Sequence, residues 1–154
     1  TFYLYFESKS AVFDSILDQA MTDLRTRIQR IEVEDPGAPP PQVQLRQQLI
    51  ETLEYIVGDR PLAQLLLKAG HTPDAEATER LEQFFADIRA LIERALETGV
   101  EIGLVRRCNR KLVAAALLGM VRGVVEHLVT ATEPPSIDDV VTELTMVGLR
   151  GVIA

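Results

Sequence analysis

The chain of 154 residues has about the length of one domain, and its single cysteine, Cys108, excludes an internal disulfide framework. A formal net charge of −7 argues against nucleic-acid binding by the body of the protein, because an acidic surface repels DNA phosphates. The longest uncharged stretch of the apolar part, residues 112–121, is about half of the ~20 residues that cross a membrane. We therefore expect a cytoplasmic protein with no membrane partner.

The N-terminal end differs in charge from the rest of the chain. Residues 1–31 contain four acids and four bases and are neutral, so the whole acidic excess lies in residues 32–154. Because phosphate contacts need cations, any contact with DNA must come from the N-terminal end.

The first predicted helix covers residues 8–33. Ser8 is a favourable N-cap, and apolar residues then recur at three- and four-residue steps, as in an amphipathic helix of about six turns. These positions are Val12, Phe13, Ile16, Leu17, Ala20, Met21, Leu24, Ile28 and Ile31. Residues 34–41 contain Pro36-Gly37 and three further prolines, which predict an exposed loop.

Five more helices are expected after this loop. Apolar stripes and helix breakers place them at 42–57, 59–68, 74–98, 110–131 and 136–152. The predicted N-caps are Asp59, Asp74, Asn109 and Ser136. Gly99 is expected to close the helix that begins at Asp74. No segment reads as a strand, so the predicted fold is all-α.

The first residues carry a recognisable motif, Thr1-Phe2-Tyr3-Leu4-Tyr5-Phe6-x-Ser8-Lys9-x-x-Val12-Phe13. It resembles the end of the helix-turn-helix in TetR-family transcriptional regulators, where an aromatic recognition segment precedes a Ser-Lys pair that opens a linking helix. The resemblance implies three parts: residues 1–7 as the end of the DNA-binding domain, 8–33 as the linking helix, and 42–154 as the effector-binding and dimerisation domain. It also implies that most of the DNA-binding domain lies outside this chain.

Four residues of this motif are expected to contact a double-stranded DNA operator. Tyr3, Tyr5 and Thr1 each offer a hydroxyl group to a phosphate, and Lys9 offers a positive charge from the first turn of the linking helix. The alternative for Tyr3 and Tyr5 is that they are core aromatics at a helix–helix contact.

The resemblance further implies a small-molecule effector pocket between the helices at 42–57, 74–98 and 110–131. Its candidate lining residues are Tyr55, Phe84, Phe85, Met120, Arg122 and His127. Phe84 and Phe85 are equally well explained as core residues, and His127 is better explained that way. Arg122 interrupts an apolar face and has three alternative partners: an acidic effector, Glu126 one turn along, or solvent.

The resemblance also implies a homodimer in which the last two long helices of each subunit form a four-helix bundle. Small residues on the helix at 110–131 favour close approach of another helix, since glycine inside a helix costs about 0.5–1 kcal/mol relative to alanine. The candidate interface residues are Ala115, Gly119, Gly123, Val140, Leu144 and Gly148. The alternative is packing within one chain.

No catalytic, cofactor or metal site is expected. The two histidines, His71 and His127, lie far apart, and His71 beside Asp74 and Glu76 is better explained as a solvated turn than as a metal site. The basic cluster of Arg106, Arg107, Arg110 and Lys111 is interpreted as a solvated loop. The resemblance implies a ligand-responsive repressor, and a repressor needs no enzymatic activity. The alternatives are a helical enzyme or small-molecule-binding protein, and a structural helical dimer without DNA function.

Overall fold

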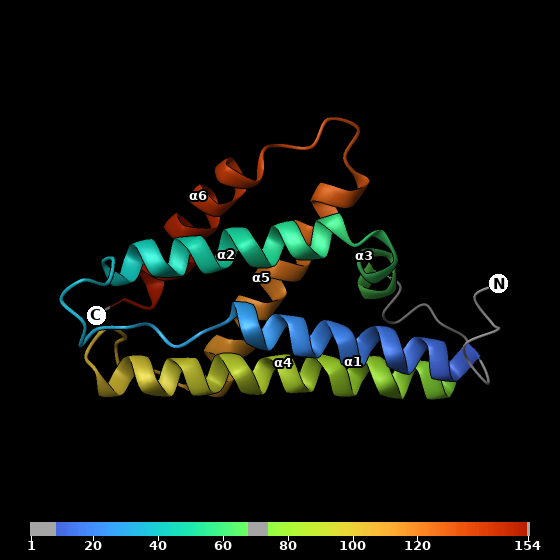
Figure 1. Ribbon diagram of the computed structural model, residues 1–154, viewed down its shortest axis with the longest axis horizontal. Helices are drawn as coiled ribbons and strands as arrows, with labels where there is room; N and C mark the ends of the chain where they lie inside the picture. Colours follow the sequence, from blue (N-terminus) through green and yellow to red (C-terminus); the bar gives the residue numbers. More distant parts are fainter. Residues whose placement is uncertain (1–8, 68–73, 154) are drawn as a thin grey trace.

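The computed structural model describes residues 9–67 and 74–153 (Figure 1). Within these ranges it contains no strand, which confirms the predicted all-α fold. The elements are α1 (Lys9–Arg27), α2 (Pro41–Gly58), α3 (Arg60–Leu67), α4 (Ala75–Glu101), α5 (Arg110–Thr130), α6 (Ile137–Gly148) and the short 3-10 helix η2 (Leu149–Gly151).

The helices form two layers around α5. In Figure 1, α1 and α4 run side by side, and the bonds of Ser10 to Glu76 and of Asp14 to Arg80 show that they run in the same direction. α2 and α6 lie together on the other side, and α5 crosses between the layers in contact with α2, α3, α4 and α6. The linking helix α1 therefore contacts α4 within its own layer and α2 in the other layer.

The core lies where these helices meet. One cluster of buried residues joins α1, α2, α3, α4, α5 and α6, and its largest fully buried side chains include Phe84, Leu17, Leu53 and Leu81. No polar or charged residue is buried among the residues that the structure describes. Burial of this apolar surface is the main favourable contribution to folding.

Four predicted N-caps are confirmed, and the fifth, Ser8, lies outside the described residues. Side-chain oxygens accept bonds from backbone N–H groups one turn ahead: Asp59 from Leu62 at 3.1 Å, Asn109 from Leu112 at 3.2 Å, and Ser136 from Asp139 at 3.1 Å. Asp74 accepts from Glu76 and Ala77 at 3.0 and 3.4 Å. These bonds satisfy N–H groups that have no partner within the helix.

The linking helix ends at Arg27 rather than at residue 33. Near its end, Thr26 Oγ1 and Arg27 Nη1 both donate to the Asp23 carbonyl, at 2.8 and 3.0 Å, and Gln29 Nε2 donates to the Thr26 carbonyl, one of the last four carbonyl groups of the helix, at 2.7 Å. The next residues are then held by α2, because the Gln48 side chain donates to the Gln29 carbonyl at 3.0 Å. The apolar pattern continues to Ile31 and gave no indication that contacts with α2 would replace the helix after Arg27.

The Gln44 side chain on α2 holds residue 32 in the same way. Its amide oxygen accepts from the Glu32 backbone N–H, and its amide nitrogen donates to the Glu32 carbonyl, both at 2.8 Å. One side chain thus pairs with both backbone groups of Glu32 and ties this residue to α2.

The prediction that Gly99 ends its helix was wrong. α4 continues to Glu101, and the chain then folds back so that the backbone N–H groups of Leu104 and Val105 donate to the Gly99 carbonyl at 2.9 and 3.0 Å. A Cβ added at Gly99 would lie 2.5 Å from Val105 Cγ2. Glycine is therefore required here for the close approach of the following loop.

Replacing Gly99 with alanine should lower the free energy of unfolding by about 1–3 kcal/mol. Alanine alone would favour the helix, but its methyl group has no space beside Val105, whose β-branched side chain is stiff. Denaturant titration of Gly99→Ala and of the double variant Gly99→Ala/Val105→Ala measures the effect. The double variant should lose less than the sum of the two single variants; a Gly99→Ala chain more stable than the original would contradict the close contact.

Candidate functional site

The predicted DNA-contacting residues fall mostly outside the described part of the chain. Thr1, Tyr3 and Tyr5 lie in residues 1–8, outside the described residues. Lys9 is the first residue of α1, and it is exposed. The DNA contacts of all four residues remain predictions.

An arginine on α4 bridges two carboxylates on α1. Arg80 Nε donates to Asp14 Oδ1 and its Nη2 donates to Asp18 Oδ1, both at 2.7 Å, and Ser10 Oγ donates to Glu76 Oε1 at 3.1 Å. The four-residue spacing of Asp14 and Asp18 places both carboxylates on one face of α1. The sequence showed this spacing, but the partner, Arg80, was not predicted. These bonds hold the first half of α1 against α4.

The end of α1 is held against α2 by Tyr55. Its hydroxyl donates to Asp23 Oδ2 at 2.8 Å, and the Arg27 guanidinium carbon lies 4.2 Å from the centre of its ring, a cation–π contact. Burial, and then the hydrogen bond to Asp23, raise the pKa of Tyr55 above its usual range. Tyr55, predicted to line the effector pocket, thus faces the linking helix.

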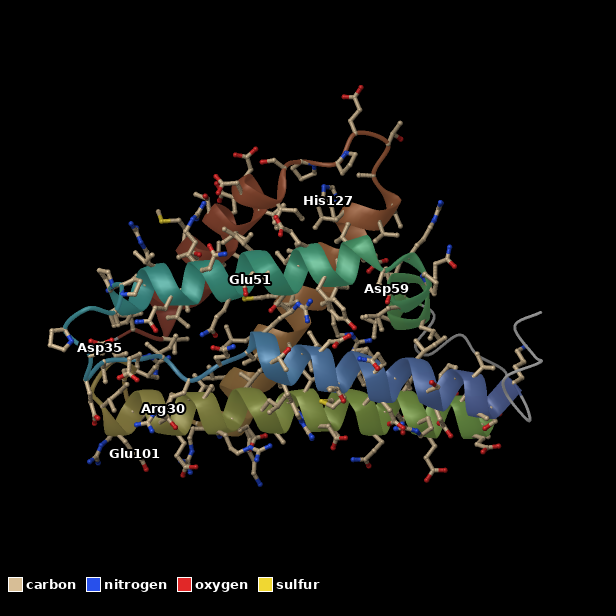
Figure 2. All side chains as sticks on the ribbon, viewed as in Figure 1. Arg30, Asp35, Glu51, Asp59, Glu101 and His127 are labelled. Carbon is tan, nitrogen blue, oxygen red and sulfur yellow. The ribbon has the colours of Figure 1, made fainter. Side chains whose placement is uncertain are left out.

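The other predicted pocket residues lie on α4 and α5. Phe84 and Phe85 are buried with their ring centres 5.7 Å apart in an edge-to-face arrangement. The Arg122 guanidinium carbon lies 3.9 Å from the centre of the Phe85 ring, so Arg122 covers the outer side of this aromatic pair. His127 is exposed near the end of α5 (Figure 2), and Met120 is half-buried. The structure thus brings Phe84, Phe85 and Arg122 together.

Two surface depressions contain polar residues of several helices. One, of about 470 Å³, is lined by Thr26, Arg27, Gln29, Glu51, Glu54 and Tyr55. The other, of about 250 Å³, is lined by Ala90, Glu93, Arg94, Glu97 and Arg110. Tyr55 is the only predicted pocket residue in either lining, so the predicted pocket around Phe84 and Arg122 stays a prediction.

One face of α5 is apolar and exposed. Ala115, Gly119 and Gly123 are exposed, and a Cβ at either glycine would meet no atom within 4 Å. Leu112, on the same helix, is 67% exposed. By length and composition α5 could cross a membrane, and it is the only such helix in the described part of the chain; only 22% of its most apolar stretch is buried. An apolar face left open in one chain is typical of a protein–protein interface.

The predicted interface residues of α6 pack against their own chain. Val140, Leu144 and Gly148 are buried in their own chain, and a Cβ at Gly148 would lie 3.2 Å from Met120 Cε. Arg46 of α2 also binds α6, through Asp138 at 2.6 Å and Thr142 at 3.1 Å. The outward side of α6 carries the apolar residues Met146 and Val147 instead, and Val147 is 69% exposed.

The described residues contain no group of three or more His, Cys, Asp or Glu side chains that could hold a metal ion. His71 lies outside the described residues, and Cys108 is half-buried and free.

Solved structures similar to this chain are transcriptional regulators. A proposed fatty acid metabolism regulator of Clostridium perfringens is 18% identical, with a TM-score of 0.76 over 99% of this chain and 80% of its own. The fatty acid degradation regulator FadR of Bacillus halodurans is 17% identical, with a TM-score of 0.73 over 97% of this chain and 76% of its own. The TetR-family regulator PfmR of Thermus thermophilus is 20% identical, with a TM-score of 0.68 over 96% and 79%. At these identities the likeness shows the fold.

The sequence itself identifies the family. No curated protein matches the chain, but residues 38–126, more than half of its length, match the family described as tetracyclin repressor-like, C-terminal domain. This region covers α2, α3, α4 and most of α5. The resemblance inferred from residues 1–13 is thereby confirmed from a different part of the sequence. The chain belongs to the TetR family of transcriptional regulators.

Proposed function

We propose that this chain is the effector-binding and dimerising part of a ligand-responsive transcriptional repressor of the cytoplasm. It acts as a homodimer that binds a double-stranded DNA operator through a helix-turn-helix, of which residues 1–7 are the end. Neither a cofactor nor an enzymatic reaction is needed for this function.

The observation that carries the proposal is the attachment of α1 to both layers of the family-matched domain. Arg80 holds the first half of α1 against α4, and Tyr55 holds its end against α2. Any ligand that moves α2 relative to α4 must therefore move or release α1. Because α1 follows the recognition segment directly, such a movement changes the separation of the two recognition helices in a dimer.

The separation of the recognition helices decides whether a dimer can bind its operator. Half-sites on B-DNA lie about 34–36 Å apart, so both recognition helices dock only at a matching distance. The exposed apolar faces of α5 and α6 support the dimer, since Leu112, Gly119 and Val147 have no cover in one chain. An effector that alters the position of α1 would then release the operator.

Replacing Lys9 with alanine, in a protein with the complete helix-turn-helix, should weaken binding to operator and to random DNA by similar factors. A phosphate contact carries no sequence information, so specificity is unchanged. The slope of log affinity against log salt concentration should fall by about 1. Fluorescence anisotropy titrations at several salt concentrations measure both quantities.

Lys111→Ala is the matched control for this test. Lys111 is exposed and lies next to Arg110, which pairs with Glu97 near the end of α4. Lys9 lies next to Ser10, which bonds Glu76 near the start of α4. At 1.5 Å per residue these two points of α4 are about 30 Å apart. Lys111→Ala should leave DNA affinity and salt slope unchanged. An unaltered slope for Lys9→Ala would show that Lys9 does not contact DNA; absence of any operator binding would favour a helical dimer without DNA function.

A further inference from the structure

The depression between α1 and α2 is an open surface site that combines acidic side chains with one aromatic ring. Its volume of about 470 Å³ lies within the range of about 300–1,000 Å³ that is usual for ligand pockets. Figure 2 marks Glu51 on α2, which lines the depression together with Glu54 and Tyr55; Thr26, Arg27 and Gln29 line it from the end of α1. The site therefore joins the two helices whose contact positions the linking helix.

A planar cation already occupies the aromatic face of this site. The Arg27 guanidinium lies over the Tyr55 ring, with 4.2 Å between its central carbon and the ring centre. Its Nη1 also donates to the Asp23 carbonyl at 3.0 Å, and the Asp23 carboxylate accepts from the Tyr55 hydroxyl at 2.8 Å. The chain's own side chain thus shows which kind of group this ring attracts.

The charges of the depression favour a second cation. Asp23 bonds the Tyr55 hydroxyl, and Glu51, which accepts from Gln47, and Glu54 line the depression, so three carboxylates stand against the one guanidinium in its lining. Both glutamates are exposed, and Glu54 forms no ion pair among the described residues. Such an excess of negative charge draws small cations to the surface.

The second depression provides a contrast. Glu93 and Glu97 line it together with Arg94 and Arg110, and Arg110 pairs with Glu97. Two acids and two bases balance, and no aromatic residue lines it. It therefore has no preference for a cation, although it also contains a pair of glutamates.

We propose that the depression between α1 and α2 binds a planar organic cation, an amidinium or guanidinium compound, which takes the place of Arg27 on the Tyr55 ring. Glu51 and Glu54 neutralise its charge. Arg27 is the last residue of α1, so its displacement removes one of the two contacts that Tyr55 makes with the end of the linking helix and leaves the hydrogen bond to Asp23. That consequence for DNA binding rests on the proposed function; the binding site does not.

Benzamidine and benzamide provide a matched pair of probes, because they share a shape and differ in charge. In two-dimensional NMR titrations of the whole chain, benzamidine should shift the backbone signals of Arg27 and of residues 51–55. It should bind at least about tenfold more tightly than benzamide. Glu54→Gln should weaken benzamidine binding about fivefold, whereas Glu93→Gln in the other depression should leave it unchanged.

The sharper test compares two arginines of α1. Arg27→Gln and Arg25→Gln each remove one positive charge near the site, but only the first vacates the Tyr55 ring. Arg27→Gln should tighten benzamidine binding about tenfold, and Arg25→Gln about twofold or less. The proposal is overturned if both variants tighten binding equally, if benzamide binds as well as benzamidine, or if Glu93→Gln weakens binding as much as Glu54→Gln.

Failure of this site and failure of the DNA function are distinguishable. The NMR titration measures binding to the chain without DNA, and the Lys9→Ala titration measures DNA binding without a cation. If benzamidine does not bind and Lys9→Ala still lowers the salt slope, only the proposed cation site is overturned.

Discussion

Phe84→Ala is expected to lower the free energy of unfolding by about 3–5 kcal/mol. Phe84 is 2% exposed and is among the largest fully buried side chains of the cluster that joins α1 to α6. It also packs edge-to-face on Phe85, 5.7 Å away, so its removal leaves a cavity and an unpartnered ring. Denaturant titration followed by circular dichroism at 222 nm measures the loss.

Val43→Ala is the control for this substitution. Val43 is 52% exposed on α2, so its truncation should change stability by no more than about 0.5 kcal/mol. The result for Phe84 also decides between its two interpretations. A loss under about 1 kcal/mol would show that the ring lines a cavity, as the effector-pocket prediction requires, rather than filling the core.

Gly119→Leu is expected to convert the proposed dimer into a monomer. In the single chain a Cβ at Gly119 meets no atom within 4 Å, so leucine fits there and its higher helix propensity does no harm to α5. In a dimer built on this face, the side chain occupies the space of the partner helix. Overpacking costs about 1–3 kcal/mol per site, and a symmetric dimer contains two such sites. We therefore expect the dissociation constant to rise by about 30-fold or more.

Sedimentation velocity over a range of protein concentrations measures this shift. Gly58→Leu is the matched control, because a Cβ at Gly58 also meets nothing within 4 Å but lies at the end of α2. It should leave the association unchanged. The interface assignment would be wrong if the original chain sediments as a monomer, or if Gly58→Leu disrupts association as strongly as Gly119→Leu.

For the described residues, the sequence was sufficient to predict the order of the helices and, apart from the end of α1, their approximate bounds. The reason is that the signals are local: an apolar residue every three or four positions, and a capping side chain that bonds an N–H group within its own turn. Asp59, Asp74, Asn109 and Ser136 cap their helices as expected for this reason. The exposed face of α5 with Ala115, Gly119 and Gly123 follows from the same periodicity.

Contacts between distant segments could not be predicted, because they depend on which surfaces meet after the helices pack. The end of α1 depends on Gln44 and Gln48 of α2, and the continuation of α4 past Gly99 depends on a loop that folds back onto it. The apolar stripe of α6 gave no sign of whether Val140 and Leu144 meet their own chain or a partner, since both kinds of contact bury the same residue types. Tyr55 was predicted to line an effector pocket. Packing places it against Asp23 and Arg27, where a hydrogen bond and a stacked cation hold the linking helix, and at the edge of the depression between α1 and α2.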